Sequence, residues 1–205
     1  MLVLASSSPR RQKLLRNAGI DFIIQPADVP EVREAGESPT DFAQRLAREK
    51  AQAIWSACQT ELARHTATVR ADERRLATGN LLVLGADTVV VVDDEVLGKP
   101  ADAADATRML RLLSGRTHQV TTGVCLIGPG FQDVRSETTD VSFDVLSPAD
   151  IAAYVAHGEP MDKAGAYAIQ GIASRWISRL EGCYFNVVGL PVPLVYRMLR
   201  QHGGA

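Results

Sequence analysis

Short apolar runs alternate with amphipathic helical patterns along the chain, and this alternation limits the fold more than any other feature. Short runs rich in Val, Leu and Ile predict buried strands, and segments with apolar residues three or four positions apart predict helices. An alternation of the two is typical of an α/β domain. No repeat, linker or low-complexity tract interrupts it, so we expect one continuous α/β domain over residues 1–205.

Caps and turns set the expected bounds of these elements. Ser8-Pro9, Ser38-Pro39 and Ser147-Pro148 each predict a helix that begins with a serine cap and a proline in its first position. Asp93-Asp94 predicts a hairpin turn. The expected strands are residues 2–5, 22–25, 81–85, 88–92, 118–127, 141–145 and 176–180, and further helices are expected after Asp102 or Asp105 and over residues 193–200.

Composition excludes several classes of protein. The chain has 205 residues with 22 Lys and Arg against 24 Asp and Glu, a net charge of -2, which argues against non-specific coating of nucleic acid. Its longest apolar stretch is broken by Asp87, so no transmembrane helix fits there. The amino terminus places apolar residues before basic ones, the reverse of a secretory signal. Cys58, Cys125 and Cys183 lack CxxC spacing and are expected to be free thiols in a reducing cytoplasm.

The first candidate site is residues 6–11, where a predicted strand ends and a predicted helix begins. The sequence there, Ser-Ser-Ser-Pro-Arg-Arg, puts hydroxyls and two arginines at the start of the helix. A helix N-terminus presents free N–H groups and a partial positive charge, and arginines there oppose the dipole unless an anion binds. The segment therefore favours a phosphate site. The alternative is a serine cap followed by two exposed arginines.

Two charged residues within apolar patterns are the next candidates. Asp87 lies between the apolar segments 81–85 and 88–92, where a carboxylate must be paired, hydrated or bound to a metal. The alternative is a buried aspartate that holds a turn. Lys50 occupies the i+7 position of an apolar helical stripe that starts at Ala43. Its ammonium either reaches solvent along its stem or faces a buried anionic ligand.

Lys99 and a glycine-rich loop that holds Asp162, Lys163 and Gln170 complete the candidates. Dispersed cations together with carboxylates are what a polyphosphate and its divalent metal require. The P-loop, GxGxxG, GxSxG and HExxH motifs are absent from the sequence. The 4 histidines show no ligand spacing, so none is expected to bind a metal.

A series of motifs runs in order along the chain. They are Leu-Ala-Ser-Ser-Ser-Pro-Arg-Arg at 4–11, Arg-Glu-Lys-Ala at 48–51, Gly-Ala-Asp-Thr at 85–88, Gly-Lys-Pro at 98–100, Leu-Ser-Gly at 113–115, Asp-Lys-Ala-Gly-Ala-Tyr at 162–167, Ile-Gln-Gly at 169–171 and Asn-Val-Val-Gly-Leu-Pro at 186–191. Together they resemble the Maf family of nucleoside triphosphate pyrophosphatases. Residues 58–80 carry no family motif, and we interpret them as a helix extension followed by a solvated surface excursion.

The resemblance implies a mixed α/β fold shared with inosine-triphosphate pyrophosphatases, a mixed twisted sheet with flanking helices in two lobes around a central cleft. It also implies a homodimer. The implied reaction is hydrolysis between the α and β phosphates, which yields a nucleoside monophosphate and pyrophosphate with a divalent cation, Mg²⁺, Mn²⁺ or Co²⁺, as cofactor. The family's proton acceptor falls on Asp87, which with Glu31 would also bind the metal. The phosphate-binding positions fall on Ser6, Ser8, Arg11, Lys50 and Lys99.

Three positions govern substrate choice within the family, and here they hold Arg10, Thr88 and Gln170. These residues resemble the branch that acts on dTTP and UTP rather than on 7-methyl-GTP. A glutamine side chain offers a donor and an acceptor, as the O4/N3 edge of a pyrimidine requires. A site for a cationic methylated purine would favour an acid and an aromatic side chain. The expected partner is therefore a pyrimidine nucleoside triphosphate, with modified pyrimidine nucleotides as further candidates, and neither nucleic acid nor a membrane is expected.

A second class of function stays open, a non-catalytic nucleotide-binding regulator of septum formation or cell division. A protein that only binds nucleotide has no need of a general base. Asp87 together with Lys50 and Lys99 therefore favours the enzyme.

Overall fold

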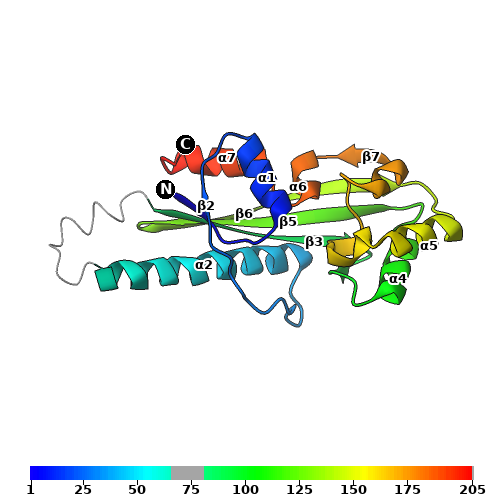
Figure 1. Ribbon diagram of the computed structural model, residues 1–205, viewed down its shortest axis with the longest axis horizontal. Helices are drawn as coiled ribbons and strands as arrows, with labels where there is room; N and C mark the ends of the chain where they lie inside the picture. Colours follow the sequence, from blue (N-terminus) through cyan, green and yellow to red (C-terminus); the bar gives the residue numbers. More distant parts are fainter. Residues whose placement is uncertain (66–80, 205) are drawn as a thin grey trace. The chain divides into compact units, whose positions relative to one another are not determined.

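The computed structural model describes residues 1–65 and 81–204. They form a mixed α/β fold, whose elements can be followed in Figure 1. The excursion expected over residues 58–80 is helical as far as His65, where helix α2 (Pro39–His65) ends. Residues 66–80 of that excursion lie outside the described residues.

Within the described residues, seven strands form one sheet in the order β2-β1-β3-β5-β6-β7, with β4 paired to β3. Strand β1 is parallel to β2 and β3, whereas β4 is antiparallel to β3 and β7 to β6. The expected mixed sheet is confirmed. The strands are β1 (Leu2–Leu4), β2 (Ile23–Ile24), β3 (Leu82–Val92), β4 (Glu95–Leu97), β5 (Thr117–Gly128), β6 (Phe131–Phe143) and β7 (Ile177–Glu181).

The flanking helices are of two kinds. The α-helices besides α2 are α1 (Pro9–Asn17), α4 (Ala103–Leu113), α5 (Pro148–His157), α6 (Tyr184–Val188) and α7 (Val192–Gln201). Three short 3-10 segments, η1 (Glu159–Asp162), η2 (Ala164–Ala166) and η3 (Ile172–Trp176), follow α5. No helix among the described residues is long and apolar enough to cross a membrane.

The described chain divides into two compact units. Unit 1 comprises Met1–Asp87, Gly123–Ser136 and Val192–Ala205, and unit 2 comprises Thr88–Thr122 and Glu137–Pro191. The boundary in β3 falls between Asp87 and Thr88, so two adjacent site candidates belong to different units. The expectation of a single domain over residues 1–205 stays a prediction.

In unit 1, helices lie on both sides of the strands. Helix α2 packs on one side through Ala47 and Ile54, which are buried in a cluster with Val83 of β3. Helices α1 and α7 lie on the other side (Figure 1), with Leu15 and Leu199 fully buried. Each buried side chain of this size stabilises the fold by about 1.5–3 kcal/mol relative to leaving it exposed.

Two glycines let α2 approach the sheet closely. A Cβ atom on Gly85 of β3 would lie 2.1 Å from the carbonyl oxygen of Ala47, and one on Gly123 of β5 would lie 2.3 Å from that of Ala43. Neither position can accept a side chain without moving the helix backbone. Lys50 follows Ala47 by one turn of α2, so the same close approach brings its ammonium group to β3 beyond Gly85.

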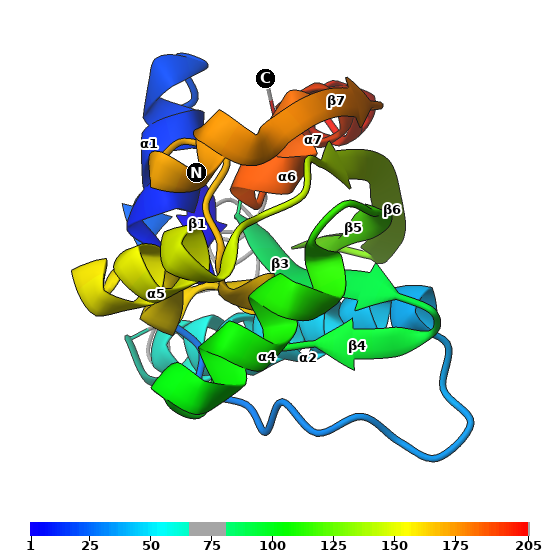
Figure 2. The ribbon, with the colours of Figure 1, turned by 90° about the vertical axis from the view of Figure 1, so that its right-hand side faces the viewer.

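The core of unit 2 lies under α4 and α5, which pack against each other (Figure 2). It includes Leu110 of α4, Tyr154 of α5 and Phe143 of β6. His118 is buried here with 2% exposure, and its Nε2 atom lies 2.7 Å from the hydroxyl of Tyr167. Burial lowers the pKa of His118 to about 4, so the ring is neutral at pH 7, and it packs edge-on against the Phe143 ring in this core.

The predicted caps and turns are confirmed. Ser8, Ser38 and Ser147 each accept a hydrogen bond from the amide three residues on, at 3.5, 3.1 and 3.1 Å. Asp93 and Asp94 adopt φ angles of 49° and 65°, the left-handed pair that a tight hairpin between β3 and β4 needs.

Two expectations about strands are wrong. Strand β3 runs unbroken from Leu82 to Val92, so Asp87 lies within a strand and not at a turn between two strands. Its charge does not end the strand because Lys50 is paired with it. Val145 does not extend β6, which ends at Phe143, and it is 82% exposed. The chain leaves the sheet there to reach the cap of α5.

The cysteines are free thiols among the described residues, as expected. Burial raises the pKa of Cys125 to about 12 and also raises the pKa of Cys58. Since the thiolate is the reactive form, neither is a nucleophile at pH 7.

Candidate active site

The amino terminus of α1 supplies the first part of the site, in unit 1. Ser6 is buried, and its Oγ accepts hydrogen bonds from the Ser8 amide and from Nη1 of Arg11, both at 3.2 Å. The first turn of α1 holds no acidic residue, so Arg10 and Arg11 add to the positive end of the helix dipole. Residues 6–11 therefore form a positively charged helix terminus that is rich in hydrogen-bond donors, as a phosphate site requires.

A buried ion-pair cluster lies at the centre of the site. Nζ of Lys50 is 2.6 Å from Oδ1 of Asp87 and 2.6 Å from Oε1 of Glu31. The Lys50 and Asp87 side chains are only 9% and 10% exposed, whereas Glu31 is 48% exposed. Lys50 therefore does not reach solvent along its stem, and its ammonium is held between two carboxylates.

The balance of burial and charge leaves Asp87 more basic than an ordinary aspartate. Burial raises the pKa of Asp87, and the positive charges of Lys50 and Arg11 oppose that rise. Burial also lowers the pKa of Arg11, against the charge of Asp87. A carboxylate that binds a proton more readily than usual suits the role of proton acceptor.

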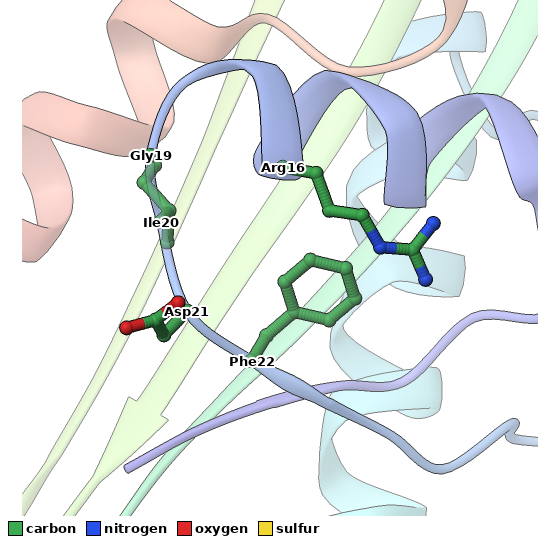
Figure 3. Close-up of a pocket in the computed structure, with 5 residues that line it drawn as sticks. All are labelled: Arg16, Gly19, Ile20, Asp21 and Phe22. Atoms are coloured by element: carbon green, nitrogen blue, oxygen red, sulfur yellow. The ribbon is translucent and has the colours of Figure 1, made fainter.

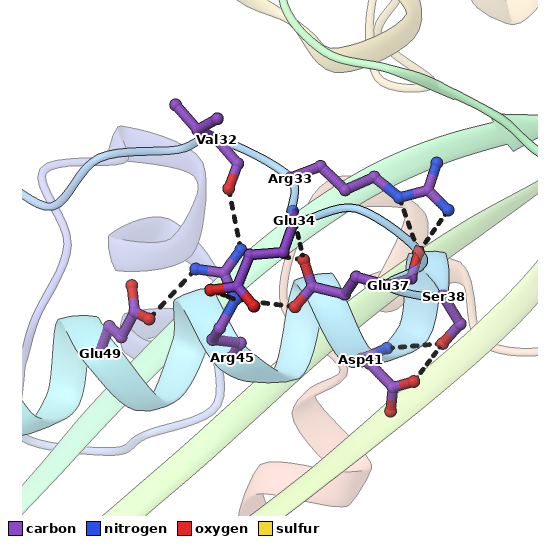
Figure 4. Close-up of polar contacts among 8 residues, drawn as sticks. All are labelled: Val32, Arg33, Glu34, Glu37, Ser38, Asp41, Arg45 and Glu49. Carbon is purple, nitrogen blue, oxygen red and sulfur yellow. Dashed lines mark hydrogen bonds and ion pairs between the residues drawn. The ribbon is translucent and has the colours of Figure 1, made fainter.

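The loop that carries Glu31, residues 26–38, is strapped to α2 by one arginine (Figure 4). Nε and Nη2 of Arg45 donate to the two carboxylate oxygens of Glu37 at 2.7 and 2.9 Å, and Nη2 also donates to the Val32 carbonyl at 2.9 Å. Nη1 donates to Glu49 at 3.1 Å. The Arg45 guanidinium holds the pKa of Glu37 below its usual value. This bidentate pair fixes the loop on the helix that also supplies Lys50.

Thr88, Lys99 and Gln170 sit on separate segments of unit 2. Oγ1 of Thr88 is 2.9 Å from Oγ1 of Thr122 and donates to the Gly189 carbonyl at 3.3 Å. The Thr122 hydroxyl in turn donates to the carbonyl of Asn186 at 3.3 Å. Thr88 is thus held by neutral groups of β5 and of the Asn-Val-Val-Gly-Leu-Pro motif.

Lys99 is exposed in the loop after β4. The carbonyl of its neighbour Gly98 accepts a hydrogen bond from the Gly165 amide at 3.0 Å. This bond joins two motifs that lie far apart in the sequence. Gln170 is exposed in a turn that follows η2. The structure therefore brings Ser6, Ser8, Arg11, Glu31, Lys50 and Asp87 together in unit 1, where Arg10 also lies in the first turn of α1. It supports Thr88, Lys99 and Gln170 separately in unit 2.

The carboxylates fit a divalent cation only in part. Among the described residues, no group of three or more His, Cys, Asp or Glu side chains could hold a metal ion by itself. Asp87 and Glu31 direct one oxygen each to the same atom, Nζ of Lys50. Mg²⁺ is commonly held by one or two carboxylates together with substrate phosphates. The donor set thus fits a cation whose coordination a nucleotide completes.

A cavity of about 220 Å³ after α1 is separate from this chemistry. Its lining residues are Arg16, Gly19, Ile20, Asp21 and Phe22 (Figure 3). The Arg16 guanidinium lies 5.5 Å from the centre of the Phe22 ring. None of the site residues expected from the sequence lines this cavity, and we assign it no role.

Sequence reasoning missed the side chains that hold the site in place. Arg45 and Glu37 are an example, because a charged residue on a predicted helix carries no local signal of a partner in a loop. Glu159 and Tyr154 of unit 2 are another, since their hydrogen bonds reach a segment beyond two 3-10 turns. A search for charges just outside the motifs would have found Arg45, which precedes the Arg-Glu-Lys-Ala motif.

Comparisons with known proteins show which family the chain belongs to. The chain is 54% identical over 202 residues to the dTTP/UTP pyrophosphatase of Koribacter versatilis (strain Ellin345), covering 98% of this chain and 94% of the relative. It is 48% identical to the dTTP/UTP pyrophosphatase of Symbiobacterium thermophilum over 202 residues, again 98% and 94% of the two chains. A solved structure, the Staphylococcus aureus Ham1 protein, aligns over 98% of each chain at a TM-score of 0.48 and 14% identity. The family model of Maf-like proteins matches residues 1–202, and the chain belongs to that family.

Proposed function

We propose that this protein is a nucleoside triphosphate pyrophosphatase that hydrolyses dTTP and UTP to the nucleoside monophosphate and pyrophosphate. The observation that carries the proposal is the buried carboxylate of Asp87, whose pKa is raised while Lys50 and Arg11 stand beside it. Relatives 45–54% identical to the chain are named dTTP/UTP pyrophosphatase, which supports the substrate class.

In the proposed reaction, Asp87 takes a proton from the attacking water. The water oxygen forms a bond to the α phosphorus, and the bond from that phosphorus to the bridging oxygen breaks as pyrophosphate leaves. Arg11 and the start of α1 stabilise the negative charge that grows on the phosphate oxygens. Lys50 orients the Asp87 carboxylate through its 2.6 Å contact with Oδ1.

A divalent cation is part of the proposal. Asp87 and Glu31 would hold it, together with phosphate oxygens of the substrate. When bound, such a cation neutralises phosphate charge and makes water more acidic.

The family resemblance extends the proposal to further residues of both units. It adds Lys99 as a phosphate contact, and Arg10, Thr88 and Gln170 as the residues that select the base. We also propose a homodimer, a cytoplasmic location and no nucleic-acid partner. The free thiols support a reducing compartment.

The experiment is a panel of nucleoside triphosphates with each of the three cations. We expect turnover of dTTP and UTP well above that of ATP, GTP and 7-methyl-GTP, and its loss in Asp87→Asn. Asp21→Asn, an exposed aspartate, is the matched control and should keep parental turnover. Nucleotide binding without turnover would instead support a non-catalytic regulator.

A further inference from the structure

The turn that carries Gln170 is closed by one backbone hydrogen bond. The Gly171 amide donates to the Ala168 carbonyl at 3.0 Å. Ile169 and Gln170 are therefore the two central residues of a four-residue turn, and Gln170 is exposed at its tip.

Both ends of this turn are held by the side chains of Tyr154 and Glu159. Before the turn, the Ala168 amide donates to the Tyr154 hydroxyl at 3.3 Å. After it, the Ile172 amide donates to the Glu159 carboxylate oxygens at 3.1 and 3.3 Å. The Tyr154 hydroxyl itself donates to Oε1 of Glu159 at 2.8 Å. We call Tyr154 and Glu159 the turn clamp.

The clamp is rigid because its surroundings fix each member. Tyr154 is 2% exposed on α5, and the Trp176 ring packs edge-on against its ring at 5.3 Å. A Cβ atom on Gly171 would lie 2.1 Å from Oε1 of Glu159, so the turn backbone lies directly on the carboxylate. Burial and the Glu159 charge raise the pKa of Tyr154, which keeps its hydroxyl a donor at neutral pH.

Several hydrogen bonds to a carboxylate restrain the backbone of this solvent-exposed turn. Such restraint is useful where the side chain at the tip of the turn must keep one position. A side chain that reads a base edge has that need, since a hydrogen bond weakens steeply when its angle departs from linear. Resting on the proposed function, the geometry points to Tyr154 and Glu159 as positioning residues that hold Gln170 for recognition of the pyrimidine base.

The test is a double-mutant cycle between the clamp and Gln170. Tyr154→Phe keeps the buried ring and removes the hydroxyl, and Gln170→Ala removes the base-reading group. We expect Tyr154→Phe alone to lower kcat/KM for dTTP about tenfold, the effect of one ordinary hydrogen bond, mainly through KM. In the Gln170→Ala background the same substitution should change kcat/KM by less than about twofold.

Three further measurements distinguish the possible outcomes. Tyr196→Phe, on an exposed tyrosine of α7, is the matched control and should leave kcat/KM and hydrogen exchange unchanged. Hydrogen exchange of the amides at 168–172 should become faster in Tyr154→Phe, and Glu159→Gln should give the same KM increase as Tyr154→Phe.

Equal losses of kcat/KM from Tyr154→Phe with and without Gln170 would overturn the inference, as would an unchanged KM. Absence of dTTP turnover in the parent would instead overturn the proposed function, and the inference with it.

Discussion

The candidate residues of unit 1 and unit 2 are held by different kinds of interaction. In unit 1, charged groups are packed against one another: Lys50 contacts both Asp87 and Glu31, and burial raises the pKa of Asp87. In unit 2, the residue next in the sequence, Thr88, is held by hydroxyls and carbonyls, and Gln170 stands on a clamped turn.

The contrast shows how the two tasks of such an enzyme call for different environments. Proton transfer and phosphate chemistry need charges that water does not screen, so they gather where burial is deep. Selection of a neutral base needs donors and acceptors held at fixed angles, which the hydroxyl and carbonyl contacts of Thr88 and the clamped turn of Gln170 supply. Changes to the buried charges Lys50 and Asp87 should therefore act on turnover, and changes around Gln170 on the choice of substrate.

The largest effect should come from the buried carboxylate. Asp87→Asn removes the proton acceptor and should lower kcat for dTTP by about 10²–10⁴ while the fold persists, since an amide has nearly the same shape. Steady-state kinetics and the melting temperature are measured on the same sample. Turnover within about tenfold of the parent would remove Asp87 from this role.

The next effect concerns the stability of the neutral core of unit 2. His118 has a pKa of about 4 in the folded protein and about 6.5 when unfolded, so the unfolded state binds more protons between these values. The free energy of unfolding should thus fall by about 3 kcal/mol as the pH drops from about 6.5 to about 4. Urea denaturation of the parent and of His118→Gln across this range measures it. The variant should lose less stability, and identical pH dependence in both would contradict the assignment.

A smaller effect is expected on selectivity. Gln170→Glu loses a donor toward the base and adds a negative charge, so kcat/KM for dTTP and UTP should fall about tenfold. Activity on 7-methyl-GTP, measured in parallel, should fall less or rise. Unchanged use of dTTP by the variant would remove Gln170 from recognition of the base.

The smallest effect should come from the Arg45–Glu37 ion pair, which holds the loop of Glu31 on α2. Arg45→Met breaks the pair with Glu37 and should lower kcat/KM about threefold to tenfold, with more divalent cation needed for half-maximal rate. The charge-reversed pair Arg45→Glu with Glu37→Arg should recover part of the loss, because it restores opposite charges. If the cation concentration for half-maximal rate stays at the parental value, the ion pair is not needed to position the loop of Glu31.

The sequence predicted what local patterns encode, and missed what distant contacts decide. The serine cap and proline of α1 and the hairpin at Asp93-Asp94 follow from residues within one turn of each other, and both are confirmed.

Lys50 stood out because a lysine interrupted an apolar stripe, yet its partners could not be predicted from that stripe alone. The unbroken course of β3 through Asp87 was missed for the same reason, since only the pairing with Lys50 makes a carboxylate acceptable there. The clamp on Gln170 spans α5 and two 3-10 turns, a distance that periodicity does not reach.

The most direct test of the central claim is hydrolysis of dTTP in ¹⁸O-labelled water with a divalent cation present. Attack by water on the α phosphorus predicts dTMP that carries one labelled oxygen and pyrophosphate that carries none, as read by mass spectrometry. Label in the pyrophosphate, release of dTDP and phosphate, or no turnover at all would contradict the account.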